Sequence, residues 1–463
     1  MYYLISNQTE LPYTELGCVP ATLVDCMNFL ETLPEISLDC ETTGLDAHLC
    51  NMFLLQLGND TDQYMIDCTT VDIVPLKALL ETKLIVGQNL KFDLKFLFNY
   101  MIHPRKLWDT FVVEKVLNCG LVGVRASLDV LCERYLDRKL DKSERAGITS
   151  ARLTASSLKY GAEDIRCLSG IKTAQLKQLL VKDLLGAANL ENRFTPCLAY
   201  IEYCGFKLDA TKWRLKMEAD MVTLQTAERT LNEWVMDKGF RKYIATQLDL
   251  FAPVDCNINW ASSKQVIELF EYLGISCVVF DKGVSKKSVE ASVIEKQAPL
   301  FDIIPLYLAY KKADKVVSTY GESFLKQINS VTGRIHTSFK QVLDTGRISS
   351  GGKDKATKEN YINFQNIPSD KNTRSCFVAE AGNTLIISDY SGQEQIMLAN
   401  KAMDKNILKF YDEGLGDMHA FVASKMYPEL EGLSLDDIKS NHKDKRQRAK
   451  ICGFAINIFG VQV

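Results

Sequence analysis

The sequence lacks the patterns that mark secreted, membrane-spanning and zinc-binding proteins. It has no run of about 18 apolar residues, so we expect neither a membrane span nor a membrane partner. Its first residues, Met1-Tyr2-Tyr3-Leu4, bring no basic segment ahead of an apolar core, so no secretory signal is expected. The 14 cysteines are scattered, without a CxxC pair or a Cys/His zinc spacing. We therefore expect free thiols and a reducing, cytoplasmic location.

A surplus of positive charge is also lacking. The formal net charge is -3, so bulk charge gives no sign of a nucleic-acid partner. Local basic clusters still attract phosphates, and a metal-binding cluster is itself acidic. With 463 residues, of which 46% are hydrophobic and 24% charged, the chain is long enough for about two to four globular domains.

The first part of the chain has short apolar runs followed by helical patterns. Strands are predicted at Ile36–Asp39, Met52–Leu57, Tyr64–Ile66 and Leu84–Val86. Helices are predicted at Phe92–Tyr100, Asp109–Leu117, Leu128–Leu136 and Ser156–Leu180. This order predicts an α/β domain in which helices cover a mixed sheet.

The rest of the chain is predicted to be mostly helical at first, then α+β. Amphipathic helices are predicted at Thr211–Asp237, Ser263–Tyr272 and Leu306–Ile328. Strand patterns return at Arg334–Phe339 and Thr384–Ser388 and are followed by helices. The natural boundaries give three predicted domains, 1–186, 187–330 and 331–463.

Two acids on one predicted strand begin the first candidate site. Asp39 and Glu41 stand at i and i+2, so their carboxylates point to the same face of the sheet. Like charges at this spacing are costly unless a counter-charge lies between them, and a divalent cation supplies one.

Two helices add the remaining groups of this site. Asp93 follows Asn89 by one helical turn, and Tyr160 and Asp164 share a helix face at i and i+4. Carboxylate oxygens suit Mg²⁺ or Mn²⁺. Two such ions about 4 Å apart activate water and stabilise a leaving 3′ oxygen, which is the requirement of phosphodiester hydrolysis.

In this order, the pairs Asp39/Glu41 and Tyr160/Asp164, with Asp93 between them, resemble the three motifs of the DEDD 3′→5′ exonucleases that carry a tyrosine. The resemblance implies a ribonuclease-H-like sheet, two metal ions held by the four acids, and a water positioned by the tyrosine. It also implies that Asn89 contacts a single-stranded DNA 3′ end. In similar proteins the position of Asp109 is not a metal ligand.

Two polar segments resemble the parts of A-family DNA polymerases that hold primer-template DNA. They are Thr345–Ser350 and Asn363–Pro368. The resemblance implies that Arg347 reaches the minor groove near the primer end, and that Gln365 and Asn366 contact the duplex. Because minor-groove acceptors are shared by all base pairs, such contacts test pair shape without reading sequence.

An apolar run that ends in an acid, Leu385–Asp389, resembles motif A of the same family. The resemblance implies that Asp389 and the Tyr390 carbonyl bind two catalytic Mg²⁺ ions. It also implies that Glu394 lies beneath the sugar of an incoming dNTP, where it excludes a ribose 2′-OH.

A helical pattern with two cations follows motif A. Arg446, Lys450 and Phe454 recur every four residues and therefore share one helix face. This pattern resembles motif B, the nucleotide-binding helix of the fingers. The resemblance implies that Lys450 is the general acid for the leaving pyrophosphate, that Phe454 stacks on the nucleotide, and that His419 contacts the triphosphate.

With thumb-like segments at Ile258–Val266 and Lys311–Gly321, the resemblance covers residues 30–457. It implies an exonuclease domain, a helical thumb and partial palm and fingers of a right-hand polymerase of the bacterial pol I-like group. The short region before the exonuclease resembles phage-type members, which would act in a bacterial host cytoplasm.

The resemblance weakens after Asn457. Ile458 stands where motif B has an aromatic residue, and the sequence ends without the family's last palm motif. We expect an intron, an intein or a split gene here, with a separately encoded C-terminal fragment needed for polymerisation. A stand-alone 3′→5′ exonuclease with a DNA-binding clamp, and a truncated DNA-binding product without catalysis, are the alternatives.

Overall fold

The computed structural model describes residues 1–140, 153–240, 256, 258–281, 284–353 and 360–459, without the side chains of Asp281 and of residues 454–459. Two compact units make up the chain, Met1–Asn383 and Thr384–Val463. The predicted domain boundaries near residues 186 and 331 stay predictions. Within the described ranges no helix has both the length and the apolar character needed to cross a membrane.

The first unit begins with a seven-stranded mixed sheet in the order β2-β1-β5-β4-β3-β6-β7. Its strands are β1 (Tyr2–Ile5), β2 (Val19–Pro20), β3 (Glu35–Thr42), β4 (Met52–Gly58), β5 (Gln63–Asp67), β6 (Leu84–Gly87) and β7 (Lys106–Asp109). Strand β4 is antiparallel to β3 and β5, while β6 is parallel to β3 and β7. The mixed sheet was predicted correctly, but β1, β2 and β7 were not foreseen.

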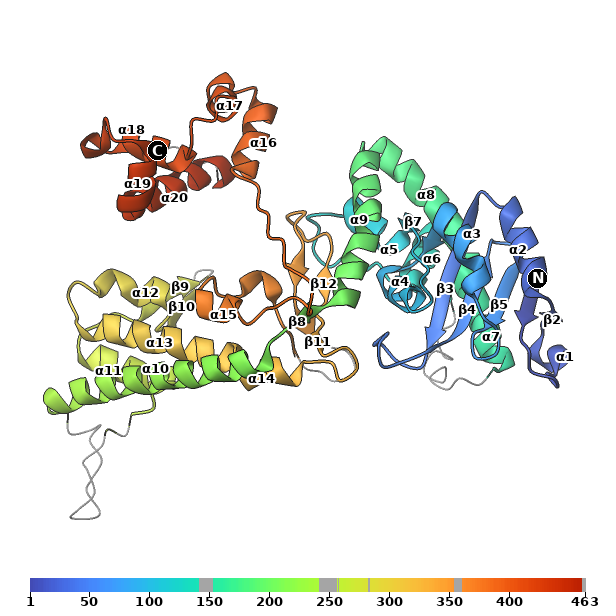
Figure 1. The fold of residues 1–463 in the computed structure, drawn as a ribbon, viewed down its shortest axis with the longest axis horizontal. Helices are drawn as coiled ribbons and strands as arrows, with labels where there is room; N and C mark the ends of the chain where they lie inside the picture. Colours follow the sequence, from blue (N-terminus) through green and yellow to red (C-terminus); the bar gives the residue numbers. More distant parts are fainter. Residues whose placement is uncertain (141–152, 241–255, 257, 282–283, 354–359, 460–463) are drawn as a thin grey trace, which may run out of the picture. The chain divides into compact units, whose positions relative to one another are not determined.

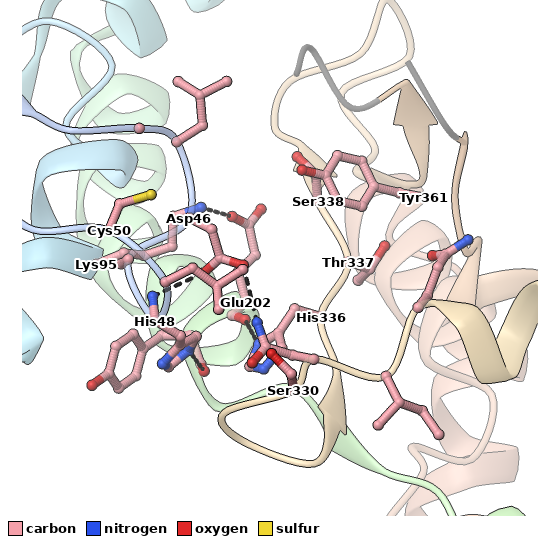
Figure 2. A pocket seen from close by; sticks show the side chains of 18 of the residues that line it. Asp46, His48, Cys50, Lys95, Glu202, Ser330, His336, Thr337, Ser338 and Tyr361 are labelled. Atoms are coloured by element: carbon pink, nitrogen blue, oxygen red, sulfur yellow. Dashed lines mark hydrogen bonds and ion pairs between the residues drawn. The ribbon is translucent and has the colours of Figure 1, made fainter. Parts of the chain in front are cut away.

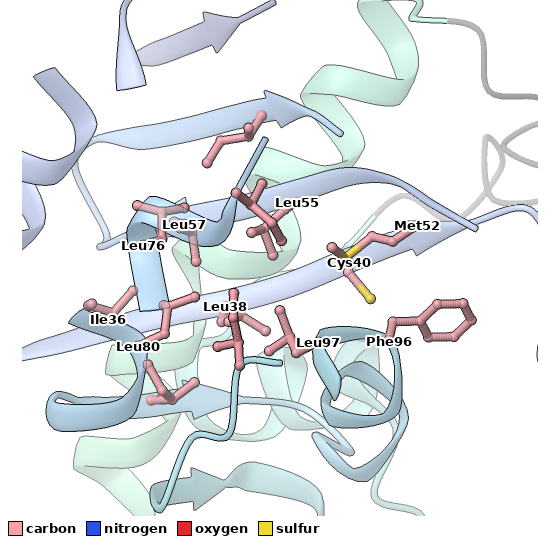
Figure 3. Packing of buried hydrophobic residues seen from close by; sticks show 14 of the residues in the cluster. Ile36, Leu38, Cys40, Met52, Leu55, Leu57, Leu76, Leu80, Phe96 and Leu97 are labelled. Atoms are coloured by element: carbon pink, nitrogen blue, oxygen red, sulfur yellow. The ribbon is translucent and has the colours of Figure 1, made fainter. Parts of the chain in front are cut away.

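Helices cover both faces of this sheet (Figure 1). One face packs against α2 (Leu23–Thr32), α3 (Lys77–Thr82) and α4 (Lys91–Phe98), and the other against α5 (Thr110–Leu117), α7 (Ala155–Arg166) and α8 (Leu168–Val181). Figure 3 shows the first core, in which Ile36, Leu38 and Cys40 of β3 meet Leu97 of α4. Alternate residues of β3 enter this core, which leaves Asp39 and Glu41 on the opposite face.

Shorter elements and one long helix complete the sheet domain. They are α1 (Tyr13–Leu16), η1 (Val74–Leu76), α6 (Leu128–Leu136) and α9 (Leu185–Cys204). Helix α9 packs against α4, α5 and β7. The single helix predicted at Ser156–Leu180 is two helices, α7 and α8, which meet at Cys167.

A helical region follows in the same unit. Its elements are α10 (Ala210–Asp237), α11 (Ser263–Tyr272), β9 (Val278–Asp281), β10 (Val284–Lys287), α12 (Ala291–Ile294), η4 (Glu295–Gln297), α13 (Ile303–Thr319) and α14 (Glu322–Lys326). Its core contains the fully buried Trp260, Phe270 and Tyr307. Helix α11 has its predicted bounds, whereas the helix predicted at Leu306–Ile328 is divided between α13 and α14.

Short antiparallel strand pairs end the first unit. They join β8 (Phe206–Lys207) to β11 (Arg334–Ile335), β12 (Phe339–Lys340) to β13 (Ser349–Ser350), and β14 (Gly352–Lys353) to β15 (Asn360–Tyr361). The 3-10 turn η5 (Phe364–Asn366) and α15 (Lys371–Arg374) follow. The strand predicted at Arg334–Phe339 is thus two strands with different partners.

The second unit is helical. Its elements are α16 (Gln393–Ala402), α17 (Lys405–Asp412), α18 (Met418–Met426), η6 (Pro428–Leu430), α19 (Leu435–Asn441) and α20 (Lys443–Phe459). The strand predicted at Thr384–Ser388 is wrong, because this segment has no regular structure and Ile386 and Ile387 are 90% and 88% exposed. A strand requires a hydrogen-bonding neighbour, and in the described part of the chain no strand pairs with this segment.

Candidate active sites

Strand β3 presents the first two acids at the centre of the sheet. Asp39 lies opposite Gln56 of β4, and the pairing of the two strands shifts register between Glu41 and Thr42. Gln56 is fully buried, and neither side-chain amide atom has a hydrogen-bond partner among the described residues. The polar face of β3 therefore continues onto β4, a feature that the sequence did not reveal.

Helix α7 brings Tyr160 and Asp164 to the same face. It packs against β3, β4 and β5 and crosses β4 at Gly161. A Cβ atom at Gly161 would lie 2.5 Å from the Gln56 Nε2 atom, so the helix needs glycine to approach this closely. Gly161 therefore sets the distance between α7 and the acids of β3.

We expect Gly161→Ala to reduce 3′-end hydrolysis at least about tenfold, because an added methyl group in a packed core forces neighbouring elements apart. The Gln56 side chain is fully buried, so it has to displace neighbouring core atoms to make way. The matched control is Gly186→Ala in α9, where a Cβ meets nothing within 4 Å and the substitution should leave activity unchanged. Hydrolysis of a labelled oligonucleotide by both variants tests this expectation, and equal rates would contradict it.

Asp93 lies in the first turn of α4 and is 2% exposed. Its Oδ1 atom is buried without a hydrogen-bond partner among the described residues. A buried carboxylate oxygen without a donor is costly, which makes this atom suited to a cation. The turn before α4 contains Asn89, which has a positive φ of 59° and is exposed.

Asp109 fixes that turn. Its carboxylate accepts the backbone N–H groups of Asn89 and Leu90, both at 2.8 Å, and those of Phe111 and Val112 at the start of α5. Burial raises the pKa of Asp109 to about 6, against the opposing effect of these hydrogen bonds. Its lone pairs are thus used by the backbone, which agrees with its exclusion as a metal ligand and gives it a positioning role that the sequence did not reveal.

The four acids act on one another electrostatically. Asp39 keeps some contact with solvent, but desolvation by the surrounding protein and the charges of Asp93, Asp164 and Glu41 raise its pKa well above its usual range. Burial also raises the pKa of Asp93 to about 7. The structure therefore brings together the four carboxylates that the sequence singles out.

The chemistry of these groups suits hard divalent cations. Among the described residues no three His, Cys, Asp or Glu side chains already converge on one point. Nevertheless, desolvation and the charges of Asp93, Asp164 and Glu41 raise the pKa of Asp39, and among the described residues no donor reaches Asp93 Oδ1. Oxygen donors of this kind suit Mg²⁺ or Mn²⁺.

The predicted DNA-contacting loop is held by its own polar side chains. The Gln365 amide accepts the Ser350 N–H at 2.6 Å and donates to the Ile348 carbonyl at 3.3 Å. Arg347 and Asn366 are exposed. The side chain of Gln365 therefore fixes the backbone that carries Arg347, a task that the resemblance did not assign to it.

The second unit has a cavity of about 420 Å³ at the predicted nucleotide site. Its lining includes Asp389, Tyr390, Glu394, His419, Arg446 and Lys450. Asp389, Tyr390 and Glu394 are all exposed, and the side chain of Phe454 lies outside the described part. The cavity thus collects residues from the segment before α16 and from α16, α18 and α20, which lie up to 61 positions apart, between Asp389 and Lys450.

Asp417 organises the cationic side of this cavity. It accepts two hydrogen bonds from the Arg446 guanidinium, at 3.0 and 2.6 Å, and caps α18 through the Ala420 N–H. Burial lowers the pKa of His419; Asp417 opposes this shift, while Arg446 and Lys450 add to it. The ion pair of Asp417 with Arg446 was not predicted from the sequence.

A sheet domain with a carboxylate cluster, a helical region and a separate cationic cavity define a nucleic-acid enzyme with two candidate catalytic sites. A family model described as "3'-5' exonuclease" matches residues 20–180, and one described as "DNA polymerase family A" matches residues 237–463. DNA polymerase I of Aquifex aeolicus is 30% identical over 455 residues, which cover 93% of this chain and 69% of that protein. The chain belongs to DNA polymerase family A and has the family's 3′–5′ exonuclease domain.

Further relatives agree with this assignment. DNA polymerase I of Pseudomonas aeruginosa is 28% identical over 467 residues, which cover 93% of this chain and 47% of that protein. The chain therefore spans less than half of that relative. The POL domain of Pol1 from M. smegmatis, solved in complex with DNA primer-template and dNTP, has a TM-score of 0.70 at 20% identity, covering 94% of this chain and 70% of that one. The predicted family and fold class are confirmed.

Proposed function

We propose that the chain hydrolyses single-stranded DNA 3′ ends at the carboxylate cluster and binds primer-template DNA and dNTPs through its polymerase region. The mutual electrostatic effect of Asp39, Glu41, Asp93 and Asp164 is the observation that carries this proposal. Such a cluster is costly for the fold and is explained by cation binding. Two Mg²⁺ or Mn²⁺ ions, when bound, supply a metal-activated water and neutralise charge on the leaving 3′ oxygen.

The chain's own residues prepare the hydrolysis. The four acids would bind the two cations, and Tyr160 on α7 would orient the attacking water. Asn89 contacts the substrate strand from a turn that Asp109 fixes through backbone hydrogen bonds. Because the turn does not have to be reorganised during the reaction, the entropic cost of reaching the reactive geometry is reduced.

The cavity of the second unit supports dNTP binding. Arg446, Lys450 and His419 offer cationic or hydrogen-bonding contacts to a triphosphate, while Asp389 and the Tyr390 carbonyl provide oxygen ligands for a second pair of Mg²⁺ ions. Glu394 lies in the same lining, where it excludes a 2′-OH. Phe454 would stack on the nucleotide from the last turns of α20.

The polymerase part of the first unit supports duplex binding. Arg347 is exposed beside a backbone that Gln365 holds, and Asn366 is exposed one residue further on. We propose that Arg347 and Asn366 contact the primer-template and that Gln365 acts through the backbone. The separately encoded C-terminal fragment, the phage origin and the cytoplasmic location stay predictions.

A 5′-labelled single-stranded oligonucleotide with Mg²⁺ tests the proposal. We expect stepwise shortening from the 3′ end, reduced at least about a hundredfold by Asp164→Ala because a metal-ligating acid is lost. Shortening that survives in Asp164→Ala would refute the nuclease assignment. On a primer-template with dNTPs, shortening without extension favours the stand-alone exonuclease, and binding with neither activity favours the non-catalytic alternative. Extension after addition of a C-terminal fragment supports the expected split polymerase.

A further inference from the structure

Helix α4 carries Asp93 on one side and two lysines on another. Lys91 and Lys95 are spaced at i and i+4, so both side chains leave the same face of the helix. Both reach Glu202 in α9, Lys91 at 2.5 Å and Lys95 at 3.0 Å. Figure 2 shows Lys95 and Glu202 beside His336 at the edge of a cavity of about 580 Å³.

Glu202 is more than an exposed ion-pair partner. Its side chain is 1% exposed and also accepts the Phe339 backbone N–H at 2.6 Å. Lys91 donates a second hydrogen bond to the Phe339 carbonyl. Both backbone groups of Phe339 are therefore bonded to the same pair of charged side chains, one from α4 and one from α9.

The Glu202 backbone strengthens this junction. Its carbonyl accepts a hydrogen bond from His336 Nδ1 at 2.8 Å, and the other ring nitrogen of His336 lies 2.8 Å from the Thr332 hydroxyl. The segment from Thr332 to Phe339 is thus attached to the end of α9 at several points. Because these groups are close-packed and hydrogen-bonded, a shift of the segment from Thr332 to Phe339 is transmitted to α9 and α4.

The junction leads to the predicted DNA-contacting loop. Phe339 begins β12, which pairs with β13, and Gln365 holds the backbone of β13 next to Arg347. A continuous series of backbone and side-chain hydrogen bonds therefore runs from the predicted DNA-contacting loop, residues 345–350, to helix α4, which carries Asp93.

We infer that Glu202 is a positioning residue for the nuclease reaction, which fixes α4 and hence Asp93 by pairing with Lys91 and Lys95 and by binding, together with Lys91, the backbone of Phe339. The inference rests on the proposed nuclease function. Removing the Glu202 charge leaves two lysines facing each other without their acid, so α4 shifts and a metal ligand moves with it. Supporting groups of this kind change metal affinity and activity by about 10- to 100-fold.

Glu202→Gln is the test, because glutamine keeps the size and one acceptor for the Phe339 N–H. We expect kcat for shortening of a single-stranded oligonucleotide to fall about tenfold or more, with KM changed less than about twofold. Mn²⁺ binding, followed by electron paramagnetic resonance without DNA, is expected to weaken by about the same factor.

Glu191→Gln is the matched control. Glu191 lies on the same helix, but its carboxylate accepts its hydrogen bond from Gln341 of the polymerase region rather than from a lysine of α4. We expect wild-type kcat and Mn²⁺ affinity from this variant. If Glu202→Gln equals Glu191→Gln in both measurements, Glu202 has only a structural role and the inference is wrong.

Two further variants separate the remaining outcomes. If Glu202→Gln fails to fold, Lys95→Met removes one arm of the junction and is expected to lower kcat about threefold or more at an unchanged melting temperature; an unchanged kcat overturns the inference. Undiminished shortening by Asp164→Ala would instead remove the proposed nuclease function itself. The two failures are therefore distinguishable.

Discussion

Asp39→Asn is expected to lose roughly a thousandfold or more in 3′-end hydrolysis and, without metal, to unfold at a higher temperature than the wild type. The loss of activity follows from removing a carboxylate from the proposed two-metal site, where charge stabilisation contributes several kcal/mol to the rate. The gain in stability follows from desolvation of Asp39 and from the charges of Asp93, Asp164 and Glu41, all of which raise the pKa of Asp39 and so oppose its ionisation.

The pH dependence of stability has the same origin. The pKa of Asp93 rises from 3.8 to about 7 on folding. Between these values the folded state binds more protons than the unfolded state, so the metal-free protein becomes less stable as pH rises from about 4 to about 7. Because one pKa unit corresponds to about 1.4 kcal/mol, the effect is measurable in thermal melts with a chelator. The slope should be smaller in Asp39→Asn, which removes a second carboxyl group whose pKa is raised in the folded protein.

Asp67→Asn is the opposite control. Burial alone would raise the pKa of Asp67, but hydrogen bonds from Ser6, Thr69 and Thr70 outweigh it and lower the pKa. Its ionised form therefore stabilises the fold, and the variant should be less stable yet keep its nuclease activity. Two results would contradict the first prediction. One is a melting temperature of Asp39→Asn below that of the wild type when both are free of metal. The other is an increase in the melting temperature of Asp39→Asn on addition of Mn²⁺ as large as that of the wild type.

Local patterns were sufficient to place the acids but not their supports. Asp39 and Glu41 were placed on one face because strand alternation is fixed by the backbone alone. Glu202 was missed because nothing near it in sequence indicates a buried charge; its partners lie 107 and 111 residues earlier and 137 later. Asp109 was excluded as a ligand by resemblance, while its role in fixing the Asn89 turn depends on a contact 20 residues away.

Strand predictions failed where no local rule decides. Thr384–Ser388 has the composition of a strand, but a strand forms only with a neighbour, and a sequence pattern does not identify the neighbour. Helix α11 was predicted at its true bounds because a helix satisfies its backbone internally and its apolar face repeats within ten residues. For side chains, Gln365 is an example of what the sequence does not determine. An exposed amide in a loop can bind the backbone or a ligand, and the sequence pattern is the same in both cases.

Lys450→Ala is expected to weaken binding of a fluorescent dNTP with Mg²⁺ by about tenfold. A charge-assisted hydrogen bond to phosphate contributes about 1.5–3 kcal/mol, and each 1.4 kcal/mol is about a tenfold change in affinity. Lys450 lines the cavity, and its charge contributes to the lowered pKa of His419, so it lies close to the groups that would face a triphosphate. Arg446 cannot simply replace it, because Asp417 already holds the Arg446 guanidinium through two hydrogen bonds.

Arg448→Ala provides the matched control for this measurement. Arg448 is an exposed cation on the same helix but does not line the cavity. Because Arg448 lies two residues from Lys450 on α20, its side chain faces about 200° away from that of Lys450. Its electrostatic effect on a triphosphate is therefore only long-range, and salt screens such effects within about 8 Å at 0.15 M ionic strength. We expect Arg448→Ala to bind within about twofold of the wild type at that salt concentration. Equal losses in both variants would show that bulk charge on α20, rather than a contact in the cavity, attracts the nucleotide, and the assignment of Lys450 would fail.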